Sequence, residues 1–182
     1  VMLAGLGKAG DLDAESLRRA AGKAVGRAVN ADMSGLLICM PDVRDCGMTP
    51  GDAAEALMEG AVLANYRFDF YKKEKPHNAL KSIAFAVGKD FAGQARSLAQ
   101  KTEIVCQGTH MARNWVSMPP NDKRPARFAR SIVKAAEKHR LETVVLDTGD
   151  LRKNKMQALL AVAAGSGSRP QMVILDYKPE TW

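Results

Sequence analysis

The chain has 182 residues and a formal net charge of +7 at pH 7, which allows one ordinary domain or two small ones. Its 46% hydrophobic and 26% charged residues are typical of a soluble globular protein. No apolar run approaches the ~20 residues that span a bilayer, and the three cysteines form no C-x-x-C pair. The sequence therefore predicts neither a membrane protein nor a disulfide framework, and it favours the cytoplasm.

The chain begins with "VMLAGLGKAG", in which Gly5, Gly7 and Gly10 fit the spacing G-x-G-x-x-G. A dinucleotide site needs a strand before this motif and a helix that opens inside it. Here the helical spacing begins only at Ala14, with Asp11 or Asp13 as the expected N-cap. We therefore interpret "VMLAGLG" as a short strand followed by a turn into a helix, and the glycines as part of that turn.

Strand and helix patterns then alternate along the chain. Gly22 and Gly26, four residues apart in the first helix, indicate a close packing partner. The next segments are a strand at 35–40, a helix capped by Thr49 with Pro50 and Asp52 in its first turn, a polar excursion at 67–81 and a strand at 82–88. A long helix at 90–113 is expected to bury Phe91, Ala95, Leu98, Ile104 and Val105. This alternation predicts an α/β fold with largely parallel strand pairing.

Three prolines in "SMPPNDKRP" interrupt this pattern, because proline fits neither a helix interior nor a central strand. We place a domain boundary between about 110 and 122, with a first domain at 1–112 and a second segment at 113–182. The second segment is expected to hold a helix at 124–139, a strand at 143–147, the stretch "MQALLAVAAGSGS" and a strand at 171–177. Such a short α/β unit buries too little apolar surface to be a stable independent domain.

The positive charge is concentrated in the second part of the chain. Residues 1–110 carry 14 Lys and Arg against 13 Asp and Glu, whereas residues 111–182 carry 13 against 7. Five of these basic residues line one face of the predicted helix at 124–139: Arg124, Arg127, Arg130, Lys134 and Lys138. Such a stripe can follow the phosphates of nucleic acid with a steep salt dependence. A solvated outer face and a surface for an acidic partner are the alternatives, and few aromatic residues lie nearby to stack on bases.

Candidate catalytic or metal-binding residues are weakly indicated. His77, His110 and His139 belong to no recognisable pattern of metal ligands, and we place the last two near helix C-termini, where a cation is favoured. Asp147 and Asp150 follow a strand end, and we interpret Asp150 as a helix cap. The run "GSGS" at 165–168 lacks the lysine of a P-loop and precedes a strand. The sequence thus predicts no catalytic and no metal-binding residue in this chain.

Four segments, in order, resemble the leucyl aminopeptidase (cytosol aminopeptidase) family. They are "LAGLGK", "EGAVLANYRFDFYK", "ARNWVSMPPNDKRPARFA" and "MQALLAVAAGSGSRPQMVILDYKP". The first resembles a strand and turn of the family's N-terminal domain, and the third its linker into the catalytic domain. Asn114 stands where the family usually has Asp, and Ser117 stands where it usually has Asn.

The resemblance implies a three-layer, macrodomain-like N-terminal domain, incomplete here, followed by the first α/β unit of the peptidase catalytic domain. It implies an enzyme that uses two divalent metal ions, Zn or Mn, to release N-terminal amino acids from peptides, and that forms homohexamers. The family's metal-binding segments match nothing in this sequence, so we expect an internal piece of such an enzyme that binds no metal, is inactive alone and supplies packing surface. A module that binds ADP-ribose or nucleic acid is the alternative.

Overall fold

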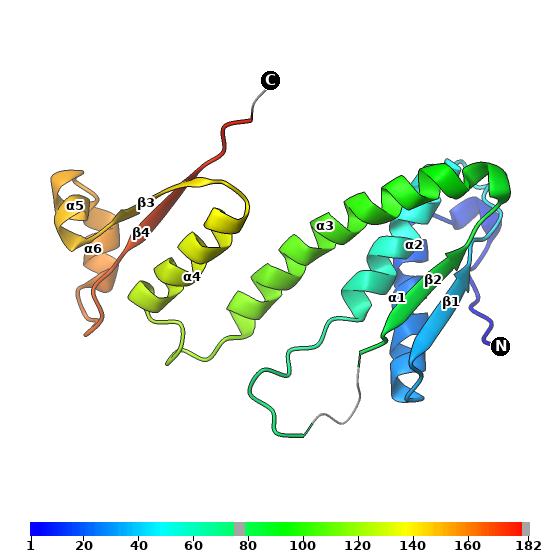
Figure 1. The fold of residues 1–182 in the computed structure, drawn as a ribbon, viewed down its shortest axis with the longest axis horizontal. Helices are drawn as coiled ribbons and strands as arrows, with labels where there is room; N and C mark the ends of the chain where they lie inside the picture. The colour runs from blue at the N-terminus through cyan, green and yellow to red at the C-terminus, as the bar shows by residue number, and fades with distance from the viewer. Residues whose placement is uncertain (75–78, 180–182) are drawn as a thin grey trace. The chain divides into compact units, whose positions relative to one another are not determined.

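A computed structural model describes residues 1–74 and 79–179. The chain divides into two compact units, Val1–Val116 and Ser117–Trp182, which Figure 1 shows with their elements labelled. Helices and strands are mixed in both units, so the predicted α/β class is confirmed. No helix in the described ranges is both long and apolar enough to cross a bilayer.

The first unit is built around two parallel strands joined through a helix. Its elements are α1 (Ala14–Asn30), β1 (Gly35–Cys39), α2 (Pro50–Ala64), β2 (Ser82–Ala86) and α3 (Ala92–Ser117), with 3-10 turns at Ala9–Asp11 and Lys89–Phe91. The strands pair in register from Gly35 with Ser82 to Cys39 with Ala86. A single helical crossover returns the chain to the end where β1 began, so parallel pairing follows.

Side-chain caps fix where the first two helices begin. The carboxylate of Asp13 accepts a 2.7 Å hydrogen bond from the Ser16 amide at the start of α1. At α2, the Thr49 hydroxyl accepts from the Asp52 amide at 3.1 Å and donates to the Asp52 carboxylate at 2.7 Å, with Pro50 in the first turn. These contacts confirm both predicted starts, since they satisfy amide groups that the helix itself leaves free.

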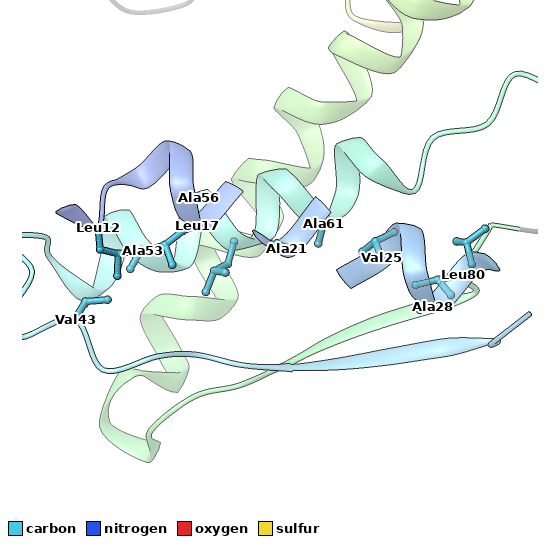
Figure 2. Packing of buried hydrophobic residues seen from close by; sticks show 12 residues of the cluster. Leu12, Leu17, Ala21, Val25, Ala28, Val43, Ala53, Ala56, Ala61 and Leu80 are labelled. Atoms are coloured by element: carbon cyan, nitrogen blue, oxygen red, sulfur yellow. The ribbon is translucent and has the colours of Figure 1, made fainter. Parts of the chain in front are cut away.

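The main core lies between α1, α2 and one face of the sheet (Figure 2). The α1 side chains Leu17, Val25 and Val29 are almost fully buried. The sheet contributes alternate residues: Leu36, Ile38, Ile83 and Phe85 pack on this core, whereas Leu37 on the other face is 62% exposed. This alternation follows from the two-residue period of a strand.

Glycines let α1 and α2 approach closely. A Cβ on Gly60 of α2 would lie 2.8 Å from the carbonyl carbon of Arg18 in α1, whereas a Cβ on Gly22 would meet Ala64 at an ordinary 3.6 Å. Gly22 therefore has the close partner that its spacing indicates. Gly26 has no neighbour within 4 Å of such a Cβ, so the prediction fails at that position.

Helix α3 packs on α2 through a second, smaller cluster that includes Ala54, Met58 and Ala95. The predicted buried side of α3 is correct at its start and wrong further on. Ile104 and Val105 are 70% and 54% exposed, whereas Thr102 and Cys106 are buried. The buried stripe runs through Ala95, Thr102 and Cys106, at spacings of seven and four residues, which keep one face of a helix inward.

The predicted strand in "VMLAGLG" is wrong. Residues 1–8 have no regular structure, and the side chains of Val1 and Leu3 are fully exposed. A strand is stable only when its backbone pairs with another strand, and β1 and β2 pair only with each other among the described residues. Leu6 does pack against the core, and Gly7 has a φ of +87° in the turn that follows.

The second unit contains α4 (Pro125–Lys138), β3 (Glu142–Leu146), α5 (Thr148–Lys153), α6 (Gln157–Ala163) and β4 (Met172–Asp176). Its two strands are antiparallel, with Glu142 opposite Asp176, so the expectation of largely parallel pairing is wrong here. Two short helices lie between these strands, whereas a single helix, α2, lies between β1 and β2. The second helix brings the chain back to the end of the sheet where β3 stopped, and β4 therefore runs in the opposite direction.

Candidate functional site

The basic face of α4 consists of Arg124, Arg127, Arg130, Lys134 and Lys138. All five side chains are exposed, and Ala129 and Ala136 are buried on the opposite side of the helix. Pro125 starts the helix at its first turn, with Arg124 as the N-cap residue. The structure therefore brings the five predicted residues together along one solvent-facing side.

An ion pair with Asp122 partly neutralises this basic face. Arg127 donates to Asp122 at 2.9 Å, and the Nε of Arg130 donates to the Ala126 carbonyl at 3.2 Å. An ion pair between exposed side chains adds little stability and is screened by salt. The face thus keeps a net positive charge that an anionic partner can use, and the prediction of such a contact stays a prediction.

Asp147 and Asp150 form a helix cap. The Asp147 carboxylate accepts from the amides of Gly149 and Asp150 at 2.7 and 3.0 Å, and the Asp147 amide donates to Asp150 at 3.2 Å. These backbone amides hold the pKa of Asp147 below its usual value. The predicted capping role is correct for the pair, but Asp147, not Asp150, is the N-cap residue. A carboxylate engaged in this way is a structural group.

The histidines lie in different settings. His139 ends α4, as expected, and is exposed. His110 is in the interior of α3, which continues to Ser117, so its predicted place near a helix C-terminus is wrong. Its ring packs on Tyr66 with 5.1 Å between centroids, and burial, assisted by the Arg113 charge, lowers the pKa of its imidazole. His77 lies outside the described residues.

A pocket of about 350 Å³ lies beside His110, where the end of α2 meets β2 and α3. Its lining consists of Val62, Asn65, Tyr66, Arg67, Ile83, His110 and Asn114. The Tyr66 hydroxyl donates to the Asn114 side chain at 2.8 Å, and the Arg113 guanidinium lies 5.5 Å from the Tyr66 ring centroid. Sequence reasoning missed this pocket, although Tyr66 and Asn114, which both line it, lie in two of the segments that resemble the family.

The glycine turn at the start of the chain does not form an anion site. A Cβ at Gly5, Gly7 or Gly10 would meet nothing within 4 Å, so no backbone or side chain approaches them closely. The first turn of α1 is already occupied by the Asp13 carboxylate and also carries Glu15. A phosphate would be repelled from a helix start that holds two acidic groups.

A two-metal centre does not fit the described residues. Across 1–74 and 79–179, no group of three or more His, Cys, Asp or Glu side chains could hold a metal ion. Two metal ions that clamp an attacking and a leaving oxygen need several such ligands around one site. We therefore derive no metal-assisted step from these residues.

The chain is thus an α/β protein of two units, with a pocket beside His110 in the first unit and a basic helix face in the second. The family model for the N-terminal domain of the cytosol aminopeptidase family matches residues 1–75, and the model for the catalytic domain of the same family matches residues 110–181. The chain belongs to the cytosol aminopeptidase family.

Two relatives show how much of such a protein the chain spans. It is 30% identical over 177 residues to a probable cytosol aminopeptidase of Cenarchaeum symbiosum (strain A), covering 97% of this chain and 35% of the relative. It is 32% identical over 181 residues to a probable cytosol aminopeptidase of Rhizobium leguminosarum bv. trifolii, covering 98% of this chain and 36% of the relative. The chain thus spans about a third of the length of the curated relatives it matches.

Solved structures also match this chain over about a third of their own length. The bottromycin maturation enzyme BotP in complex with Mn superposes with a TM-score of 0.83 at 28% identity, over 97% of this chain and 36% of BotP. A mutant of tomato leucine aminopeptidase superposes with a TM-score of 0.79 at 23% identity, over 92% of this chain and 34% of that enzyme. The second likeness concerns the fold alone.

Proposed function

We propose that this chain is part of a two-metal leucyl aminopeptidase that releases N-terminal amino acids from peptides. The observation that carries the proposal is the ordered match to both domains of one family, over 1–75 and 110–181. The solved BotP structure is a complex with Mn, which supports metal dependence of the whole enzyme. Zinc and manganese both remain candidates for the two ions.

Within that enzyme, we propose that these residues supply structure and packing surface, and that the chain alone does not hydrolyse peptides. The described residues offer no metal-ligand cluster, and without one the attacking water has no activating ion. The test is hydrolysis of a leucyl anilide by the isolated chain, with Mn²⁺ or Zn²⁺ added. No turnover is expected, and metal-dependent turnover would refute the proposal.

The identity of the whole enzyme needs a separate test, because an inert piece cannot report it. Reading the gene past the Trp182 codon should reveal the metal-ligand segments of the family, including G-K-x-x-x-D-x-G-G. A protein that includes those segments should hydrolyse the leucyl anilide and lose activity on removal of metal. A gene that lacks them would point to a binding or assembly role.

We propose further that the whole enzyme forms homohexamers in the cytoplasm. The support is the family resemblance together with relatives that carry the name cytosol aminopeptidase. Sedimentation velocity on the whole enzyme tests the assembly, since a hexamer and a monomer differ several-fold in mass. A monomer at micromolar concentration would exclude the hexamer.

Contact with an anionic partner through the basic face of α4 is a second candidate. The favourable observation is the exposure of all five basic side chains on one side of the helix. Nucleic acid would be held there mainly by phosphate contacts and therefore in a salt-dependent manner. Substitution of Arg127, Arg130 and Lys134 by Gln separates this contact from a merely solvated face, since only a phosphate contact makes retention on DNA depend on them.

A further inference from the structure

The pocket beside Tyr66 combines a cation, amide donors and apolar walls. All of its lining residues belong to the first unit. At about 350 Å³, its volume lies in the range of small-molecule sites. Val62 and Ile83 provide apolar surface, whereas Arg67, just after α2, and Asn114, in α3, provide polar groups.

Arg67 is held in place by the end of α2. One guanidinium nitrogen, Nη1, donates to the carbonyls of Ala64 and Tyr66 at 3.2 and 2.8 Å. These bonds cap a helix C-terminus and fix the half-buried side chain. Among the contacts of the described residues, the hydrogen bonds of Arg67 use only Nη1. Nε and Nη2 can therefore donate to a carboxylate in a bidentate manner.

Asn114 is oriented by Tyr66. Its Oδ1 accepts the Tyr66 hydroxyl at 2.8 Å, which directs the amide so that Nδ2 offers two N–H donors. The Tyr66 ring is itself held by His110 and by Arg113. Among the described residues, none that lines the pocket is acidic. The pocket thus presents donors and positive charge without a neutralising carboxylate in its lining.

His110 contributes an uncharged imidazole to the lining of the pocket. Its Nε2 is shielded from solvent and has no hydrogen-bond partner among the described residues. Burial lowers the pKa of its imidazole, and the nearby Arg113 charge acts in the same direction. At pH 7 the positive charge at the lining therefore comes from Arg67, not from the histidine.

We propose that this pocket binds a small carboxylate with a short aliphatic tail, with the carboxylate on Arg67 and Asn114 and the tail against Val62 and Ile83. An arginine fork matches the geometry of a carboxylate, and a partly desolvated site strengthens that contact. A branched chain of four or five carbons covers apolar side chains of this size. The proposed contacts use only side chains of this chain and need no metal ion.

The test is a titration of the whole 182-residue chain with 3-methylbutanoate, followed by amide NMR spectra. Saturable shifts are expected for the amides around Tyr66, Arg67 and Asn114. The uncharged analogue 3-methylbutanamide has nearly the same shape and should bind about tenfold more weakly or worse, because it cannot form charge-assisted bonds. Equal affinity for the acid and the amide, or no saturable shift, would overturn the proposal.

Substitutions of the residues that line the pocket provide a second test of the proposal. Asn114→Asp keeps an acceptor for the Tyr66 hydroxyl but adds a negative charge and removes the amide donors, so affinity for the acid should fall about tenfold or more. Arg67→Gln should have a similar effect, and Arg67→Lys, which keeps the charge but not the fork, should fall in between. Arg44→Gln, which alters an exposed arginine outside the lining, is the control. Unchanged affinity in a folded Asn114→Asp chain would refute the site.

Discussion

Substitution of Gly60 by Ala tests the contact between α1 and α2 most directly. An added Cβ would lie 2.8 Å from both the carbonyl carbon and the Cα of Arg18, and closer still to its carbonyl oxygen. Ordinary Cβ contacts begin at 3.4 Å, so relief of the contact with the carbonyl oxygen requires the two helices to separate by about an ångström. The obstacle is backbone, which cannot turn aside as a flexible side chain can.

The size of the effect follows from two opposing contributions. Overpacking a close-packed site costs typically 1–3 kcal/mol, and separation of the helices also loosens the buried contacts of Ala21, Leu57 and Ala61. Alanine gains up to about 1 kcal/mol over glycine from helix propensity. We therefore expect Gly60→Ala to destabilise the first unit by about 1–2 kcal/mol in net terms.

Gly22→Ala is the matched control, because it adds the same methyl group to the facing helix. Its Cβ would sit 3.6 Å from the Ala64 Cβ and the Gly60 carbonyl oxygen, at ordinary van der Waals distance. The propensity gain should then stabilise the unit by up to about 1 kcal/mol. Urea unfolding and hydrogen exchange at the α1 amides would measure both changes, and the exchange data report on the first unit alone. A Gly60→Ala chain as stable as Gly22→Ala would refute this account of the contact.

Three further predictions concern a cap, a histidine and the basic face of α4. Thr49→Ala removes the acceptor for the Asp52 amide at the start of α2, and should cost about 1 kcal/mol in urea unfolding, whereas Thr49→Ser should restore it. Because the folded-state pKa of His110 lies below its usual 6.5, the unfolded chain binds more protons as pH falls through that value. Stability should therefore drop between pH 7.5 and pH 5.5, and His110→Gln should flatten this dependence in urea midpoints; an unchanged slope would contradict the assignment. The carboxylates with lowered pKa stay ionised over this range. Replacement of Arg127, Arg130 and Lys134 by Gln should lower retention on immobilised DNA and flatten its salt slope, and identical elution of variant and parent chain would mean that the face is only solvated.

Local sequence signals predicted most elements of the chain. Thr49 with Pro50 and Asp52, and Asp13 before Ala14, are caps whose hydrogen bonds form within three residues. Such contacts depend on nearby residues alone, so they can be read from the sequence. The basic face of α4 was also predictable, because helical spacing places residues three and four apart on one side.

The misjudged features depend on residues far apart in the sequence. Whether "VMLAGLG" is a strand depends on a pairing partner, and Ile104 and Val105 are exposed because α2 covers another side of α3. The antiparallel pairing of β3 and β4 follows from the two short helices between them. The pocket needs Tyr66 and Asn114 side by side, 48 residues apart.

The sequence by itself determined the family, the starts of α1 and α2 and the charge of the basic face, because these reside in short motifs and in helical spacing. Only the tertiary structure decided the direction of the second strand pair, the inward side of α3 and the pocket beside His110. Burial and strand pairing are settled by which segments meet in space. The close approach of Gly60 to Arg18 illustrates this difference: the glycines of α1 indicate a close partner, but only the packing of α1 on α2 shows which residues meet.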